Sequence, residues 1–242
     1  MPRQAIAAQS NCFTCQTRKR TEWCILGEED LALLDRTKKS REHLPGELIF
    51  NEGEVCAGIY CIETGLIGVR RFDAHGNSIL LRLAYPGDTL GYRSVLTEEK
   101  HRVGAEVLQG GRVCFIDRDA VRALIGRNPA LGLRFLKRAT RELDAAEEKV
   151  FSDATMSMRM RFIHLLLVLK DRFATIAESG AFTLELPLSR QDLAAMIGAR
   201  PESLSRTIKS LEDDGIAHFS GRTVHVPRLD TLLNEIELSE DK

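Results

Sequence analysis

The sequence predicts an α+β protein in which a strand-rich N-terminal half is followed by helices. From His43 to about Asp117, short apolar runs alternate with glycine-containing turns, which is typical of a compact all-β sandwich or barrel. After Asn128-Pro129, apolar residues recur every three or four positions, which indicates a long helix. Beyond Met156, further helical patterns end in a pair of short strands.

Composition limits the function classes. The 242 residues suffice for one large or two small domains, and 43% hydrophobic with 29% charged residues is typical of a folded globular protein. The formal net charge of −1 does not indicate a nucleic-acid partner, so any such role needs a local surface. No apolar run approaches the roughly twenty residues of a membrane span, and no secretory signal precedes Asn11. We therefore expect a cytoplasmic chain whose cysteines do not form structural disulfides.

Changes in pattern divide the chain into five segments. We expect a cysteine-rich arm (1–28), a β-rich sensor domain (29–128) that opens with a helix over Glu28–Lys38, a long helix (129–155), a helical domain ending in strands (156–235) and an acidic tail (236–242), frayed from Glu235 on.

Within the β-rich domain, strands are expected at Leu48–Phe50, Gly58–Ile62, Leu66–Val69, Ile79–Leu81 and Arg112–Asp117. Their separators are turn pairs such as Pro45-Gly46, Thr64-Gly65 and Pro86-Gly87.

The long helix carries an apolar seam at steps of three, four, three and four residues: Leu136, Ala139, Leu143, Ala146 and Val150. Such a seam is typical of a helix pair. Because charges crowd the other faces, we favour a dimer interface, with packing on its own domain as the alternative.

The C-terminal segment predicts a winged helix-turn-helix. After a helix over Arg161–Phe173 and a strand over Thr183–Leu186, Ser189 opens a short helix that Gly198 ends. Pro201 starts a second helix, which stops at Asp213-Asp214-Gly215. A hairpin of Ile216–Phe219 and Thr223–Val226 follows.

In such a unit the start of the second helix enters the major groove of DNA. Glu202, Ser205 and Arg206 share one face there; Arg can bond guanine and Glu can accept from cytosine. The alternative is a weak surface ion pair between Glu202 and Arg206. The predicted DNA-binding residues, including phosphate contacts, are Glu202, Ser203, Ser205, Arg206, Lys209, Arg190, Arg200 and Arg222.

The segments Leu188–Ala194 and Glu202–Arg206 resemble the DNA-recognition motif of the CRP/FNR transcription regulators. Pro86-Gly87-Asp88 resembles the turn of their β-roll effector domain, which is cyclic-nucleotide-binding-like, and the helix after Asn128 resembles their dimerisation helix. The resemblance implies a homodimer that binds palindromic double-stranded DNA and contacts RNA polymerase.

Two branches of this family differ in what they sense. The cyclic-nucleotide branch holds its ligand with a Glu after a β-roll glycine and an Arg-Ser or Arg-Thr pair. This chain has the shorter acid in Gly87-Asp88-Thr89 and reads His101-Arg102-Val103-Gly104 at the phosphate region. A cyclic nucleotide is therefore disfavoured.

The other branch resembles FNR and holds a [4Fe-4S] cluster on N-terminal cysteines and one distant cysteine. Cys12, Cys15 and Cys24, spaced C-x2-C-x8-C, together with Cys114, are the implied ligands. The resemblance implies a switch driven by oxygen, nitric oxide or redox state that acts on subunit pairing.

Other interpretations of the cysteines stay open. The same thiols could hold zinc, could form a redox pair of Cys12 and Cys15 activated by Arg18 and Lys19, or could be inert. Cys56 and Cys61 are alternative ligands. No nucleotide-binding glycine loop or catalytic elbow is present, so an enzyme, such as a thiol–disulfide oxidoreductase, is the less favoured class.

Overall fold

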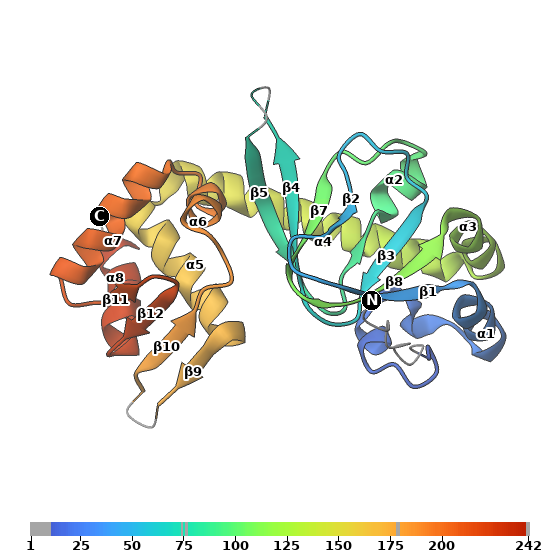
Figure 1. Cartoon of the computed structure of the whole chain (residues 1–242), viewed down its shortest axis with the longest axis horizontal. Coiled ribbons are helices and arrows are strands. Elements are labelled where there is room, and N and C mark those ends of the chain that lie inside the picture. Colours follow the sequence, from blue (N-terminus) through green and yellow to red (C-terminus); the bar gives the residue numbers. More distant parts are fainter. Residues whose placement is uncertain (1–10, 74, 76, 178–179, 241–242) are drawn as a thin grey trace, which may run out of the picture. The chain divides into compact units, whose positions relative to one another are not determined.

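The computed structural model describes residues 11–73, 75, 77–177 and 180–240 (Figure 1). Two compact units are present, Met1–Asp144 and Ala145–Lys242, and their boundary falls within the long helix α4 (Pro129–Thr155). Each unit is described by itself.

Unit 1 contains two four-stranded antiparallel sheets. The first has the order β1-β8-β3-β6 and the second β2-β7-β4-β5. Their bounds are β1 Lys39–His43, β2 Leu48–Phe50, β3 Gly58–Ile62, β4 Leu66–Phe72, β5 Ser78–Ala84, β6 Thr89–Leu90, β7 Gly104–Gln109 and β8 Gly111–Asp117. The predicted strands Leu48–Phe50 and Gly58–Ile62 are confirmed with identical bounds. Apolar side chains of both sheets, among them Phe50, Ile62 and Val107, form a shared core.

The helices of unit 1 form a second core against the outer face of the first sheet. The arm contributes two 3-10 helices, η1 (Thr17–Arg20) and η2 (Glu22–Ile25), and is followed by α1 (Glu28–Thr37). The short helix α2 (Tyr92–Thr97) and the helix α3 (Arg118–Arg127) were not predicted; Asp117 caps α3 by accepting from the Asp119 N–H. Trp23, Leu34, Ile116 and Phe135 are buried together in this core.

The helix α4 begins at Pro129, as predicted, and continues for 27 residues. Leu131 and Phe135 are fully buried against unit 1. Of the predicted seam, Ala139 is half-buried, whereas the remaining members are exposed: Leu136, Leu143, Ala146 and Val150.

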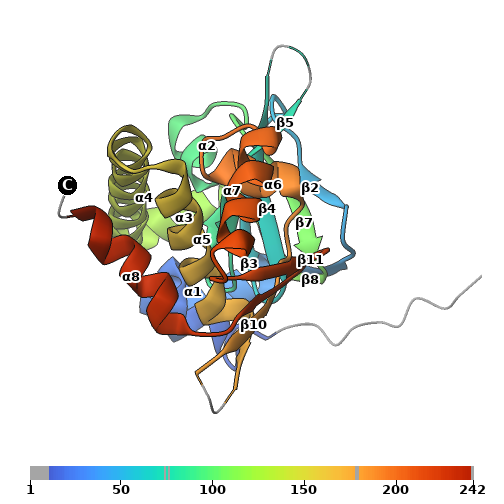
Figure 2. The ribbon, with the colours of Figure 1, turned by 90° about the vertical axis from the view of Figure 1, so that its left-hand side faces the viewer.

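Unit 2 combines helices with a small antiparallel sheet of order β11-β12-β10-β9. The bounds are α5 Met158–Phe173, β9 Ala174–Ile176, β10 Phe182–Glu185, α6 Arg190–Met196, α7 Pro201–Asp213, β11 His218–Ser220, β12 Thr223–Val226 and α8 Leu229–Glu240. Figure 2 views this unit from the side on which α6 and α7 lie together.

The turn between α6 and α7 is determined by local chemistry. The Ser189 hydroxyl accepts from the Asp192 N–H at 3.1 Å, and the Asp192 carboxylate accepts from the Ser189 N–H at 3.3 Å, which completes a capping box. Gly198 has a φ of +63°, a conformation that L side chains rarely adopt. Pro201 then occupies the first turn of α7. The predicted helix-turn-helix and its wing are confirmed.

The expectation of a frayed tail from Glu235 was wrong as far as Glu240, because α8 continues to that residue. Leu232 on this helix is completely buried, and the Glu235 carboxylate accepts from Nε of Arg159 on α5 at 2.6 Å. An apolar anchor and an ion pair therefore hold α8 as far as Glu235, the first residue of the segment expected to fray. Residues 241–242 lie outside the described residues. No helix in the described part of the chain is long and apolar enough to span a membrane.

Candidate metal centre and nucleic-acid interface

Four cysteines line one cavity of about 40 Å³ in unit 1: Cys12, Cys15, Cys61 and Cys114. Trp23, Leu34 and Ile116 form much of its apolar wall, and Arg18 and Lys38 bring two cations to it. A void of this size holds a few water molecules at most.

Sheet pairing and an arm turn position the four thiols. Cys61 on β3 and Cys114 on β8 are direct cross-strand partners, so their side chains share one face of the sheet. The arm brings Cys12 and Cys15 onto that face through a tight turn, in which the Cys15 N–H donates to the Asn11 carbonyl at 3.0 Å. The Cys12 N–H donates to Asp35 Oδ1 on α1 at 2.7 Å, which attaches the turn to unit 1.

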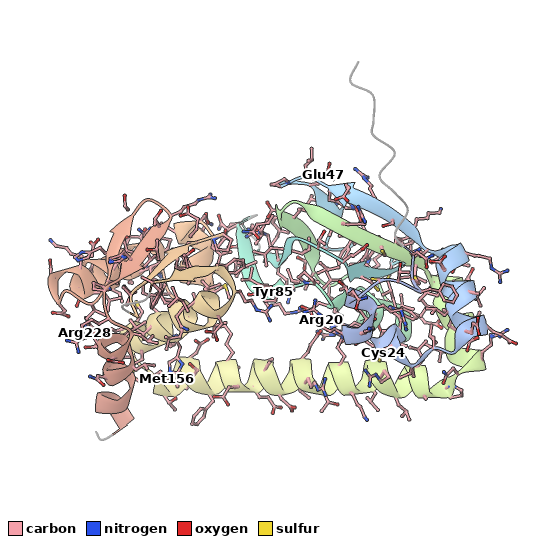
Figure 3. All side chains as sticks on the ribbon, turned by 90° about the horizontal axis from the view of Figure 1, so that it is seen from below. Arg20, Cys24, Glu47, Tyr85, Met156 and Arg228 are labelled. Atoms are coloured by element: carbon pink, nitrogen blue, oxygen red, sulfur yellow. The ribbon has the colours of Figure 1, made fainter. Side chains whose placement is uncertain are left out.

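Cys24 is the predicted site residue that the structure does not bring to this cavity. Its thiol accepts a hydrogen bond from Nη2 of Arg134 on α4 at 3.0 Å. Figure 3 shows Cys24 on the side of the arm next to α4. Cys56 is also elsewhere: it is buried and donates to the Gly58 carbonyl at 3.3 Å.

Burial makes the cavity thiols weak acids. It raises the pKa of Cys12 to about 12, because the lowering effect of the Lys38 charge is smaller than the cost of desolvating a thiolate. Burial likewise raises the pKa of Cys61 and of Cys114. The alternative in which Arg18 activates the Cys12 thiol gains no support from this geometry, because the Arg18 guanidinium donates to the carbonyl oxygens of Cys12 and Trp23, at 2.9 and 3.2 Å.

Four cysteine thiols are a donor set that fits a thiolate-bound metal centre. Their present positions, however, leave no room for one. In the described part of the chain, no three Cys, His, Asp or Glu side chains already stand in a coordinating arrangement. An iron–sulfur cube is larger than this cavity, so the four cysteine side chains would have to separate to hold one. Binding would also release the thiol protons, since metals bind the thiolate form.

The turn at Gly87-Asp88, where the cyclic-nucleotide branch binds its ligand, is covered by protein groups. A Cβ on Gly87, whose φ is +100°, would lie 3.1 Å from Cβ of Arg20 in the arm. The Asp88 carboxylate accepts from the Tyr85 N–H at 2.8 Å and from Arg138 at 3.0 Å. The acid therefore holds protein groups and does not face an open ligand site.

Arg138 connects the arm, this turn and α4. Its Nε donates to Oε1 of Glu22 at 2.6 Å, its Nη1 to Asp88 and its Nη2 to the Gly87 carbonyl. Glu22 also accepts from the Thr89 hydroxyl at 2.6 Å. Two carboxylates raise the pKa of Arg138 in spite of its burial, which lowers it, so the guanidinium stays charged. Sequence reasoning missed this network because its members are far apart in the chain.

The predicted DNA-reading side chains lie on the exposed face of α7. Glu202, Ser205, Arg206 and Lys209 are exposed, whereas the opposite face, including Leu204, is buried. Ser203 is half-buried and its hydroxyl accepts from Nη2 of Arg206 at 3.1 Å. Among the described residues, no ion pair joins Arg206 to Glu202, so the guanidinium is not held by that carboxylate.

The arginines around α7 that are predicted to contact DNA phosphates differ in their exposure and in their contacts with the protein. Arg200 and Arg222 are exposed at the start of α7 and in the wing. Arg190 lies over the Phe219 ring, 5.4 Å from its centroid, and donates to the Gly221 carbonyl at 3.5 Å. Its side chain therefore supports the wing against α6 as well as offering charge.

Comparison with known proteins identifies both units. Residues 40–128 match the cyclic nucleotide-binding domain family, and residues 160–235 match the Crp-like helix-turn-helix domain family. The chain belongs to the CRP/FNR family of transcription regulators. Its relatives are transcription regulators and not enzymes.

Curated CRP/FNR relatives align over most of the chain. The transcriptional activatory protein AadR of Rhodopseudomonas palustris is 29% identical over 77% of this chain and 77% of its own length. The transcriptional activator protein FnrL of Cereibacter sphaeroides is 26% identical over 87% of this chain and 85% of its own.

Solved structures share the CRP/FNR fold. FixK2 from Bradyrhizobium japonicum is 24% identical, covers 81% of this chain and 96% of its own, and superposes with a TM-score of 0.68. The c-di-GMP responsive regulator CLP of Xanthomonas campestris covers 83% of this chain and 99% of its own at 17% identity and a TM-score of 0.72.

Proposed function

We propose that this regulator is a cytoplasmic homodimer whose binding to palindromic DNA is controlled by an oxygen-, nitric-oxide- or redox-labile [4Fe-4S] cluster. One observation carries the proposal: cysteines of the arm and of two β-strands line a single cavity. The names of curated relatives support it, since a 26% identical protein of Bacillus subtilis and a 24% identical protein of Haemophilus influenzae are both called anaerobic regulatory protein.

Cys12, Cys15 and Cys114 belong to the proposed ligand set, and Cys24 and Cys61 compete for the fourth position. When bound, the cluster supplies iron and sulfide that oxygen and nitric oxide attack. The chain contributes four thiolates, the apolar wall of Trp23 and Ile116, and the cations Arg18 and Lys38 that offset thiolate charge. Cys15 is half-buried, which leaves an approach for small oxidants from the arm side.

The Arg138 network supports a route from the cluster to subunit pairing. Glu22 belongs to the same arm as the cysteine ligands, and its carboxylate bonds Arg138 on α4. If the arm moves when the cluster is lost, the ion pair between Glu22 and Arg138 is weakened or broken. The side chains of Arg138 and Glu22 are only 15% and 7% exposed. Breaking their ion pair leaves a buried charge unpaired, which destabilises the packing of the arm on α4.

The exposed apolar face of α4 supports the homodimer. Leu133, Leu136, Leu143 and Val150 are each more than half exposed, an unusual content of large apolar side chains for a solvated helix. A second copy of the same helix would cover them in a coiled-coil seam. Two-fold pairing places the two α7 helices on successive major grooves, which matches a palindrome, and leaves other surfaces for RNA polymerase.

Anaerobic purification followed by iron and acid-labile sulfide assay, a visible spectrum and a gel-shift series tests the proposal. We expect about four irons and four sulfides per chain and a preference for one palindrome over random DNA that oxygen abolishes. If the purified protein is colourless and contains zinc, the cysteines hold a zinc ion and the proposed cluster is wrong. Unchanged DNA affinity on loss of the cluster would separate the cluster from regulation.

A further inference from the structure

We infer that Lys149 and Asp153, near the end of α4, are positioning residues that fix α7 for DNA recognition. Neither belongs to the side chains predicted to contact DNA. They act through the turn between α6 and α7, which they hold in place from outside the helix-turn-helix. The inference concerns DNA recognition alone and does not require the proposed iron–sulfur cluster.

The first argument is the contact between Lys149 and α6. Unit 2 begins at Ala145, so Lys149 belongs to the same compact unit as the helix-turn-helix. Its Nζ donates to the Met196 carbonyl at 2.9 Å, between residues 47 positions apart in the sequence. Met196 is the last residue of α6, where helix carbonyl oxygens have no partner within the helix. A cation there satisfies one of them and suits the negative end of the helix dipole.

The second argument is the ion cluster of Lys149, Asp153 and Arg161. The Asp153 carboxylate accepts from Lys149 Nζ at 3.0 Å and from Nη1 of Arg161 on α5 at 2.9 Å, so it joins α4 to α5. Gly198 of the turn lies against this cluster. A Cβ built on Gly198 would be 3.2 Å from Oδ2 of Asp153 and 3.2 Å from Nη1 of Arg161. The backbone of the turn therefore packs directly on the ion cluster, and α7 begins three residues later.

The third argument is that the other end of α7 is held separately. Arg159 on α5 donates from Nη1 to the Ser210 hydroxyl at 2.7 Å and pairs with Asp214, the C-cap residue of α7, at 2.7 Å. These contacts remain when Lys149 is substituted. Loss of Lys149 therefore loosens the start of α7 and not its end, and the start is the part that enters the major groove.

Positioning, a direct phosphate contact and a purely stabilising role have different signatures. Hydrogen bonds to base edges need an exact placement of α7, so a loosened start costs preference for the specific sequence. A lysine that contacts phosphate strengthens binding to all sequences and adds to the salt dependence. A residue that only stabilises the fold changes the unfolding midpoint and leaves the preference of the folded protein unchanged. The bonds of Lys149 to a carbonyl and a carboxylate of the protein favour positioning.

The test compares two DNA probes on full-length chains prepared without oxygen. The specific probe is a duplex that the wild type selects from a random pool, and the nonspecific probe is a scrambled duplex of the same length and composition. K149M keeps the apolar stem and removes the cation, whereas K149R keeps a cationic donor. The Lys149 side chain is 40% exposed, so the fold should survive, and urea unfolding checks it. The matched control is K137M, which changes an exposed lysine of the same helix.

We expect K149M to bind the specific duplex about tenfold more weakly, because a charged hydrogen bond that fixes the start of α7 is lost. Its affinity for the scrambled duplex should stay within about twofold of wild type, with the same salt dependence. K149R should restore the preference and K137M should not change it. D153N should lower the same preference, and K149M/D153N should add little to the larger single effect, because both residues act on one turn.

Three results would overturn the inference: equal weakening on both duplexes, a reduced salt dependence of K149M, or a preference that K149R does not restore. A wild type that selects no sequence overturns it together with base reading by α7. A chain without iron and sulfide overturns the proposed function and leaves this inference standing.

Discussion

Arg138 and Glu22 form an ion pair between α4 and the arm, with Nε of the arginine 2.6 Å from Oε1 of the glutamate. Both side chains are nearly excluded from solvent, and each has further hydrogen bonds in the same network. In a buried ion pair, the attraction between the two charges offsets the cost of removing them from water. When one partner is substituted, the remaining buried charge has no such compensation and destabilises the fold. Removing one member of this pair should therefore destabilise the chain.

Replacing Arg138 by Ala should lower the free energy of unfolding by about 3–5 kcal/mol, because Glu22 is left charged and buried. Urea unfolding of the iron-free chain measures it. E22Q/R138A should recover part of the loss in a double-mutant cycle. The matched control is R102A, which removes an exposed pair with Glu99 and should cost less than about 1 kcal/mol. Equal losses for R138A and R102A would contradict a buried, coupled pair.

Replacing Arg206 by Ala should cost about 1–3 kcal/mol on the specific DNA site and relax the preference at one base pair, because a bidentate contact to guanine is lost. Competitive gel shifts with a set of single-base variants measure the change. K209A, one turn further along α7, serves as the comparison: it should weaken all sequences alike and reduce the salt dependence. An equal effect of R206A on random DNA would argue against base reading.

Replacing Leu143 by Asp should convert the dimer into monomers, because a carboxylate would be buried in an apolar seam. Leu143 is 58% exposed in the single chain, so the substitution should leave the fold of the chain intact. Sedimentation gives the mass, and L143M, which keeps an apolar side chain of similar volume, should remain dimeric. A dimeric L143D would place the subunit contact elsewhere.

Unit 2 should lose stability in acid through Asp153. Burial would raise the pKa of this carboxyl, but hydrogen bonds and charges of Arg161 and Lys149 outweigh burial and hold the pKa below its usual value. The stabilisation is therefore present above the unfolded pKa of about 4 and is lost as pH falls through the lower folded pKa. D153N should be less stable at neutral pH and should show a flatter acid dependence.

The pH dependence of stability is measured as the urea unfolding midpoint of wild type and of D153N across the acid range. The control E148Q changes an exposed carboxylate on the same helix and should follow the wild-type curve. Parallel curves for wild type and D153N would show that the three-residue cluster does not determine acid stability.

The sequence was sufficient for those parts of the fold that short-range chemistry determines. The strand Gly58–Ile62 is apolar, β-branched and bounded by turns, and the Ser189–Asp192 capping box needs only four consecutive residues. Such signals are read within one element. Hence several strands of the β-rich unit and the helix-turn-helix could be predicted, whereas β1, β6 and β7 were not.

The cysteine site depended on directions that spacing does not encode. The C-x2-C-x8-C pattern treats Cys24 as equal to Cys12 and Cys15, but the buried Trp23 turns it toward α4. Cys61 reads as a small core residue until the β3–β8 register places it opposite Cys114. Similarly, the acidic composition after Glu235 did not indicate that α8 continues to Glu240.

Trp23 is the single tryptophan of the chain, and its indole lies between the Cys61 sulfur and the Phe135 ring. The tryptophan fluorescence of this protein therefore comes from a single site, where the arm packs on Cys61 and Phe135. Emission should be blue and shielded while the indole is seated, should be quenched by iron nearby, and should shift to the red if the arm lifts. Under the proposed function, oxygen exposure should therefore change this emission, and the change can be followed in real time without any attached dye.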